Sequence, residues 1–465
     1  MVDNFLNTDK ADRTDNLNLS RKLKSPLQNV RGIVRSSESY HYICNPNKVG
    51  YCKELLRLRE FKNRSETCLL LHPNEKSDMK EYITIKHVGP LVDIDHIEIC
   101  QFTVLVGESA IGKSTLLKVL ILMRYLFKRA NIRSFLKQSK ITKSPFKIRF
   151  DAMVKTTNLG PMFNPDSYIK YEVQMESGHN YTLEYKGNAR KRMQLPDIAT
   201  EDLMFLKESF VSENRNVIPS WTANAYSNRN ASLGFYFHET MNDFNRAIQD
   251  DSEYELGYLG MKLAVKHPKG RPVKLTIEKQ NNSHAPIELT EASSGVQTST
   301  PLAVIVQHFA HNYSFKDAFR RSVLDYLYDS EMLTKFSPIV ELKDMPKYVH
   351  IHIEEPELSL FPDAQCRLVD DIVRIGLCDI GENLQIGMVM ATHSPYILNY
   401  INVMLHQKDA NKAHLDSKQV IAYRLYDGQA QNLMAKDDKG RIIVDTYDLS
   451  EMMAEIYKEF KALTE

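Results

Sequence analysis

The hydrophobic positions change their period several times along this 465-residue chain, and the changes predict a series of strands and helices. Residues 92–99 alternate apolar and polar side chains as a half-buried strand does, and 102–106 form an apolar run that ends at a glycine. A long helical pattern follows at 116–130. Later strands are predicted at 348–354, 386–392 and 420–427. Because helical patterns separate these strands, we expect an α/β fold with a mixed, mostly parallel sheet flanked by helices.

The middle of the chain interrupts this pattern. We expect strands at 145–154, 169–175 and 181–186, helices at 199–210 and 238–250, and a hairpin formed by 273–280 and 285–291. The chain then divides into an N-terminal extension at 1–79, partly disordered, a first lobe at 80–139, an inserted α+β lobe at 140–285, and a second lobe at 286–465. An amphipathic helix is predicted near the C-terminus at 448–463.

Composition narrows the class of protein. The hydrophobic share is 43%, the charged share is 26% and the formal net charge is +1, so bulk charge favours no particular partner. No apolar run reaches the roughly 20 residues that span a bilayer, and the polar N-terminus resembles no targeting peptide. We therefore expect a cytoplasmic protein without membrane contact. Of the six cysteines, Cys100, Cys366 and Cys378 are expected to be small buried residues with reduced thiols. A zinc site at Cys44, Cys52 and Cys68 is a less favoured possibility, because their spacing fits no standard zinc pattern.

The run GESAIGKST follows the strand at 102–106 and opens the long helix, which is the context of a phosphate-binding loop. In such a loop backbone N–H groups surround phosphate oxygens, Lys113 contacts the β- and γ-phosphates, and the Ser114 hydroxyl binds Mg²⁺. The candidate ATP-binding residues are Gly107, Glu108, Ser109, Ala110, Ile111, Gly112, Lys113, Ser114 and Thr115.

Three more segments carry candidate chemistry. The strand at 348–354 ends in two carboxylates, of which Glu354 is positioned for Mg²⁺ and Glu355 for the attacking water, with Glu357 as a supporting group. His393 follows the strand at 386–392 and is a candidate sensor of the γ-phosphate. The loop EASSGVQ opens a helix and could either bind an anion or cap the helix; its candidate nucleotide-binding residues are Ser294, Gly295 and Gln297.

Two histidines, His350 and His352, share one face of the strand at 348–354. We expect them to pack or to form hydrogen bonds against a covering element, with a metal pair as the alternative.

These motifs, in this order, resemble those of ABC-type ATPases of the RecF, SMC and OLD group, over roughly residues 82–465. SSGVQ resembles the signature, IEEPELSLFP the Walker B and D-loop region, and ATHSPYILN the switch histidine segment. The resemblance implies a head-to-head homo-oligomer in which Ser294 and Gly295 contact ATP bound by Lys113 of a second copy. The chain departs from the group's pattern at Val296, Glu354 and Phe361, and no glutamine is assigned to the Q-loop.

The chain has neither the long coiled coil of the SMC branch nor room after Tyr400 for the nuclease domain of the OLD branch. Its stand-alone form resembles the ATPases of bacterial anti-phage operons such as the PARIS system, which implies a sensor or scaffold that controls a separate effector nuclease or toxin. The alternatives are a RecF-like DNA-binding ATPase in repair or maintenance and an ATP-gated scaffold with negligible turnover.

A basic stretch at Lys118–Arg149 bears on the choice of partner, because it contains no Asp or Glu. It could bind nucleic acid, form a solvated face or dock an acidic protein.

Overall fold

The computed structural model describes residues 79–464 except 142–149, 188–192, 224–233, 280–284, 339, 342, 381–382 and 410, and for 448–454 and 464 it describes the backbone alone. The predictions for residues 1–78, including the zinc alternative, lie outside the described residues.

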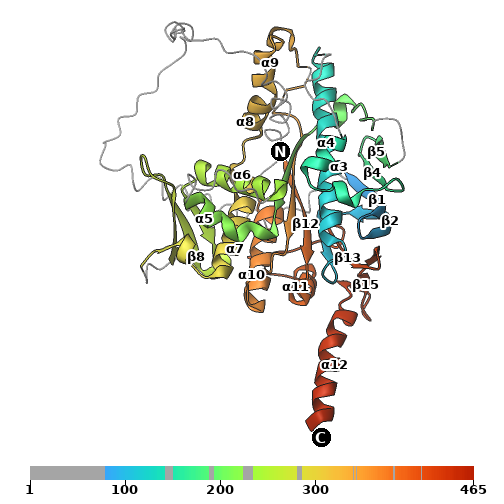
Figure 1. Cartoon of the computed structure of the whole chain (residues 1–465), viewed down its shortest axis with the longest axis vertical. Helices are drawn as coiled ribbons and strands as arrows, with labels where there is room; N and C mark the ends of the chain where they lie inside the picture. The colour runs from blue at the N-terminus through green and yellow to red at the C-terminus, as the bar shows by residue number, and fades with distance from the viewer. Residues whose placement is uncertain are drawn as a thin grey trace. The chain divides into compact units, whose positions relative to one another are not determined.

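A six-stranded sheet forms the centre of the fold, in the order β14-β13-β3-β12-β11-β6 (Figure 1). Its first five strands from the β6 side are parallel, and β14 at the other edge is antiparallel. The bounds are β3 (Phe102–Val106), β6 (Phe205–Val211), β11 (Lys347–Glu354), β12 (Leu384–Thr392), β13 (Val420–Tyr426) and β14 (Gln429–Asn432). The predicted α/β fold with a mixed, mostly parallel sheet is confirmed.

Helices cover both faces of this sheet, so its inner strands are buried on both sides. Val349, Ile351 and Ile353 of β11 join one hydrophobic core with helices on one face. Those helices are α5 (Ile218–Ala223), α6 (Phe235–Asp250), α7 (Ser294–Gln307), α10 (Pro362–Val373) and α11 (Pro395–Leu405). The alternate residues of β11 face α3 (Lys113–Gln138), which lies against β6, β11 and β12.

Two smaller antiparallel sheets flank the centre, in the orders β2-β1-β4-β5 and β10-β9-β8-β7. The first contains β1 (Lys80–Val88), β2 (Leu91–Ile99), β4 (Tyr168–Gln174) and β5 (Asn180–Lys186). The second contains β7 (Glu253–Leu256), β8 (Met261–Lys266), β9 (Lys274–Lys279) and β10 (Ile287–Glu288), so β9 and β10 form the predicted hairpin.

The remaining regular elements are short, apart from the last helix. They are α4 (Phe150–Thr156), α8 (Phe315–Phe319), α9 (Asp325–Asp329), β15 (Met434–Lys436), β16 (Ile442–Val444) and α12 (Tyr447–Thr464). The predicted C-terminal helix is therefore present as α12.

Two predictions for the middle of the chain are wrong. The expected strand at 145–154 is helical from Phe150, where Phe150, Met153 and Val154 are buried at helical spacing. The expected helix at 199–210 is instead the strand β6, which pairs with β11. Its polar residues imitate an amphipathic helix, but Lys207 and Ser209 are buried and both bind Asp243 of α6 at 2.7 Å.

The stretch predicted as an inserted lobe contributes strands to all three of these sheets, and β7, β8 and β9 belong to the second flanking sheet. Strand β4 pairs with β1, and β6 pairs with β11 of the central sheet. The predicted domain boundaries themselves remain a prediction.

Among the described residues, no helix has both the length and the apolar character needed to cross a membrane.

Candidate nucleotide site

The loop from Gly107 to Gly112 joins β3 to α3, as the sequence predicts for a phosphate-binding loop. Gly112 ends the loop with φ = 112°, a left-handed conformation that favours glycine. Lys113 is the first residue of α3, and its side-chain amine donates hydrogen bonds to the Gly107 and Glu108 carbonyls at 2.8 and 2.7 Å. Burial lowers the pKa of Lys113, and the nearby carboxylates Glu355 and Glu357 act in the opposite direction. The lysine is thus held at its own loop and close to acidic groups.

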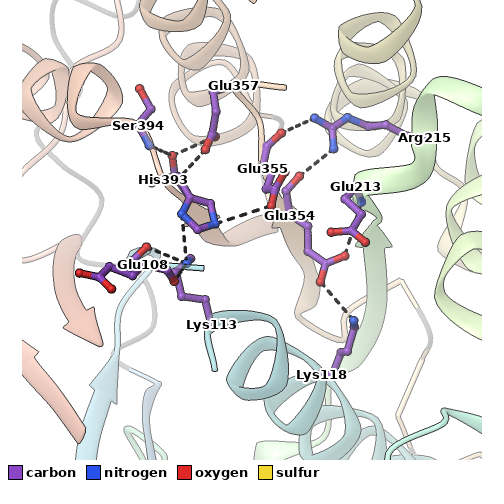
Figure 2. Close-up of polar contacts among 12 residues, drawn as sticks. Glu108, Lys113, Lys118, Glu213, Arg215, Glu354, Glu355, Glu357, His393 and Ser394 are labelled. Atoms are coloured by element: carbon purple, nitrogen blue, oxygen red, sulfur yellow. Dashed lines mark hydrogen bonds and ion pairs between the residues drawn. The ribbon is translucent and has the colours of Figure 1, made fainter. Parts of the chain in front are cut away.

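The ends of β11 and β12 bring the remaining candidates to the same place, because the two strands are parallel neighbours (Figure 2). His393, just after β12, has its Nδ1 atom 3.4 Å from Lys113 Nζ and its Nε2 atom 3.7 Å from Glu355 Oε1. Glu357 holds this strand end: its carboxylate accepts hydrogen bonds from the His393 backbone N–H at 2.6 Å and from the Thr392 hydroxyl at 2.9 Å. Glu357 therefore fixes His393, the supporting role that the sequence suggested for it.

Glu355 has an unusual backbone conformation. Its φ is +43°, in the left-handed region that side chains other than glycine rarely adopt, and its N–H donates to the Ala391 carbonyl at 2.8 Å. Such a conformation costs on the order of 1–3 kcal/mol and persists where surrounding contacts impose it, commonly at functional sites. It turns the chain at the end of β11, so that the Glu355 side chain lies beside His393 while Glu354 lies elsewhere.

Glu354 is almost fully buried and faces α3 and the end of β6. Its Oε2 atom accepts a hydrogen bond from the Glu213 N–H at 3.4 Å. Its Oε1 atom lies 3.3 Å from Lys118 Nζ, an ion-pair contact, but has no hydrogen-bond partner among the described residues. A buried carboxylate oxygen without a hydrogen bond is a suitable ligand for a hard cation. Ser114 lies one turn before Lys118 on α3, so its hydroxyl is on the helix face that Lys118 directs toward Glu354. These residues fit Mg²⁺.

Three residues of this site escaped the sequence reasoning, namely Lys118, Glu213 and Arg215. Glu213 and Arg215 follow β6. Because the sequence predicts a helix in place of this strand, it does not indicate that residues after it lie at a strand end. Burial raises the pKa of Glu213, and the negative charges of Glu354 and Glu355 raise it further. Lys118 was noted only as part of a basic stretch, where nothing in the sequence marks it as the ion-pair partner of Glu354.

The predicted signature loop lies at the start of α7. Ser294 is exposed, whereas Gly295 is buried against the loop that follows Glu355: a Cβ atom on Gly295 would lie 2.7 Å from the Ser359 carbonyl oxygen. The Gln297 amide donates to the Thr290 and Ala292 carbonyls at 3.0 and 2.7 Å. Within the described chain no hydrogen bond or ion pair joins Ser294 to the residues around Lys113. Gln297 thus holds the loop, and Ser294 faces outward.

Both candidate metal histidines form hydrogen bonds instead. His350 Nδ1 lies 3.0 Å from Glu208 Oε1, and His352 lies between the Ser209 carbonyl at 3.0 Å and Arg124 at 3.1 Å. Burial lowers the pKa of His352 to about 3, so this imidazole is neutral. The expectation of hydrogen bonding against a covering element is confirmed.

Most of the described basic residues in the stretch at Lys118–Arg149 have internal partners. Arg124 binds Glu81 at 2.6 Å, and Arg133 and Lys137 bind Asp197 at 3.1 and 2.9 Å. The segment 142–149 lies outside the described residues. Binding of nucleic acid through this stretch stays a prediction.

No protein-family model matches the chain, and no curated protein matches its sequence. Solved structures similar to it include the SMC head domain from Thermotoga maritima, at 13% identity and a TM-score of 0.34 over 77% of this chain and 99% of that one. The recombination mediator protein RecF with ATP aligns at 13% identity and a TM-score of 0.32, over 76% and 100%. A dimeric bacterial ABC transporter cassette aligns at 13% identity and a TM-score of 0.28, over 75% and 96%.

Proposed function

We propose that this protein binds and hydrolyses ATP as an ABC-type ATPase. One observation carries the proposal: β3, β12 and β11 end side by side and place His393 in contact with both Lys113 and Glu355. A phosphate-loop lysine, a carboxylate and a histidine at one edge of a parallel sheet are the groups that phosphoryl transfer to water requires.

Each residue has a role that follows from its surroundings. Lys113 contacts the terminal phosphates from within its loop, and Glu355 orients the attacking water and accepts its proton. His393 lies between them and responds to the γ-phosphate through the hydrogen bonds of its ring. Ser114 and Glu354 would hold Mg²⁺, which neutralises phosphate charge when bound. Lys118 balances the charge of Glu354 through the ion-pair contact of 3.3 Å.

The site is shared between two copies of the chain in this proposal. Ser294, at the start of α7, is exposed and forms no hydrogen bond or ion pair with the described residues around Lys113 of the same chain, as is needed for contact with phosphate held by a neighbour. The resemblance to the RecF, SMC and OLD group implies the same head-to-head assembly. ATP then acts as the link between heads, and its hydrolysis separates them.

For the biological role we infer an ATP-dependent switch that controls a partner nuclease or toxin in bacterial anti-phage defence. The support is the resemblance of the chain to AriA, the ATPase of the PARIS system. The alternative of a RecF-like DNA-binding ATPase is less favoured, because Arg124 is committed to a buried ion pair with Glu81. The third possibility, a scaffold with negligible turnover, differs from the proposed ATPase only in its rate of ATP hydrolysis.

The decisive experiment measures binding of labelled ATP and release of phosphate by the full chain with Mg²⁺. The matched variant is Lys113→Ala, which removes the phosphate-contacting amine, and the control is Lys137→Ala at the exposed pair with Asp197. Binding that is lost in the Lys113→Ala variant and kept in the control supports the proposal. Wild-type protein that binds no ATP would refute it, while binding without turnover would select the scaffold.

A further inference from the structure

Arg215 is a fully buried side chain that contacts both the catalytic strand end and the helix of the signature loop. Its Nη1 atom donates to the Glu354 carbonyl at 2.7 Å and its Nη2 atom to the Glu355 carbonyl at 2.6 Å (Figure 2). On its other side, Nε donates to the carbonyl of Thr298 in α7 at 3.0 Å. Nη1 also donates to the carbonyl of Ser212, at the end of β6, at 3.1 Å. One guanidinium therefore joins three segments that are far apart in the sequence.

The acceptors of these four hydrogen bonds are all backbone carbonyls, which has two consequences. First, a buried cation without a directly bonded carboxylate is costly, and burial lowers the pKa of Arg215 to about 10 against the opposing effect of Glu357, Glu354 and Glu355. Second, the planar fork of donors sets the relative positions of backbone atoms, which a flexible lysine cannot do. The hydrogen bonds of Arg215 therefore contribute more to the positions of these backbone atoms than to the net stability of the fold.

One of the acceptors of Arg215 is the carbonyl of Glu355, the residue with the strained backbone. Glu355 adopts φ = +43°, and the Arg215 hydrogen bond to its carbonyl is one of the contacts that hold it there, together with its own N–H bond to Ala391. Without the guanidinium the turn at Glu355 would lose a charged hydrogen bond and could relax toward an unstrained conformation. The carboxylate would then move with the backbone.

The hydrogen bond from Arg215 to Thr298 lies one helical turn from the signature loop. Thr298, whose carbonyl Arg215 holds, also donates its own hydroxyl to the Ser294 carbonyl at 2.8 Å. Gly295 packs against the Ser359 carbonyl, so the loop after Glu355 contacts the same turn of α7 directly. A displacement of the exposed start of α7 therefore reaches Glu355 along two short routes, one of which passes through Arg215.

We infer that Arg215 is a positioning residue that makes the placement of Glu355 depend on whether the start of α7 is engaged by a second copy. The inference rests on the proposed function, since it assumes that Ser294 binds nucleotide held by a partner. It adds a regulatory link within one chain: assembly of the heads adjusts the carboxylate that orients water. ATP bound by a single head is then protected from wasteful hydrolysis.

The test uses the full chain with the substitutions Arg215→Lys and Arg215→Met, and Arg133→Lys as the control at an exposed ion pair. Three quantities are measured: the Kd for ATP, kcat, and hydrogen exchange of the backbone amides at 355–360 with and without ATP. We expect Arg215→Lys to keep the Kd within about threefold and to lower kcat by about 100-fold, because a small displacement of a catalytic group has this effect. Exchange at 355–360 should increase, and ATP should no longer reduce it.

The Ser294→Arg variant tests the link without altering Arg215. Because Ser294 is exposed, this variant should fold, and its heads should still bind ATP through their own Lys113 while showing no ATP-induced protection at 355–360. Wild-type kcat together with wild-type exchange in Arg215→Lys would overturn the inference, as would ATP-induced protection that survives in Ser294→Arg. If the wild type proves unable to hydrolyse ATP, the proposed function fails on that count, and the exchange data alone still decide whether Arg215 links α7 to Glu355.

Discussion

The Nδ1 atom of His393 lies 3.4 Å from the Nζ atom of Lys113, although 280 residues separate the two in the sequence. The contact exists because β12 and β3 are parallel neighbours, so the residue after one strand meets the loop after the other. On its opposite edge the same imidazole faces Glu355. A single imidazole ring therefore contacts both Lys113, the lysine proposed to bind phosphate, and Glu355, the carboxylate proposed to orient water.

From this position we expect His393→Ala to bind ATP nearly as well as the wild type and to hydrolyse it about 10- to 100-fold more slowly, since the lysine remains and one positioned polar group is lost. Phosphate release and ATP binding are measured in parallel. His406→Ala, at the exposed end of α11, is the control. A variant with unchanged turnover would exclude a role for His393 in the chemical step.

The substitution Glu355→Gln should keep ATP binding and reduce hydrolysis by about 100-fold or more, because an amide cannot accept the proton of the attacking water. The joined heads should then accumulate with ATP, which light scattering would detect as an ATP-dependent increase in mass. Glu201→Gln, an exposed glutamate outside the site, provides the comparison. Turnover near the wild-type rate would assign the water to another group.

The shared site predicts recovery of activity on mixing two inactive variants. Lys113→Ala removes the phosphate contact, and Ser294→Arg places bulk and charge at the start of α7. A mixed pair of heads contains one site with both residues intact and one with both lesions, so partial ATPase activity should return once subunits exchange. Each variant mixed with wild type controls for exchange. Mixed heads that co-assemble but stay inactive would count against the shared site.

A buried ionic cluster predicts how stability depends on pH. Burial by itself would raise the pKa of Glu208, but facing positive and polar groups outweigh it and lower the pKa from 4.5 to about 2. The groups that face this carboxylate from neighbouring elements are His350 and His352 of β11, Arg124 and Lys128 of α3, Glu81 of β1 and Tyr171 of β4.

Because the folded pKa of Glu208 is depressed, its contribution of about 3 kcal/mol is present above pH 4.5 and is lost as the pH falls toward 2. Urea unfolding between pH 6 and pH 3 should show the free energy of unfolding decreasing with falling pH. In Glu208→Gln the protein should be less stable at pH 6 and its stability should vary less with pH across this window. Parallel pH profiles for the two proteins would show that Glu208 does not titrate in this way.

The features that can be predicted from the sequence are those that depend on neighbouring residues and on few contacts with distant segments. The phosphate-binding loop was found because glycines, a lysine and a serine stand at fixed spacing between an apolar strand and a helix. The ends of β11 and β12 were found because buried parallel strands are continuous apolar runs that stop at polar residues. Both kinds of signal lie within about ten consecutive residues, so a single sequence displays them in full.

The failures have a common cause as well. Strand β6 is predicted as a helix because polar residues such as Lys207, Glu208 and Ser209 interrupt its apolar run, whereas in the core these three contact tertiary partners on α6 and β11. With the strand misread, its end could not be recognised, and Glu213 and Arg215 were missed. The basic stretch gives no local sign of which of its residues form ion pairs. Their partners Glu81, Glu354 and Asp197 come from other segments of the chain.

The amino-acid sequence by itself determined the candidate phosphate-binding loop, the order of the strand ends that follow it and the candidates Lys113, Glu354, Glu355 and His393, since their signals are local. Only the tertiary structure decided which side chains meet. It placed His393 between Lys113 and Glu355, paired Lys118 with Glu354, and set Arg215 between Glu355 and α7. The reason is physical: hydrogen bonds and ion pairs between distant segments depend on strand order and burial, and neither is written in the spacing of residues along the chain.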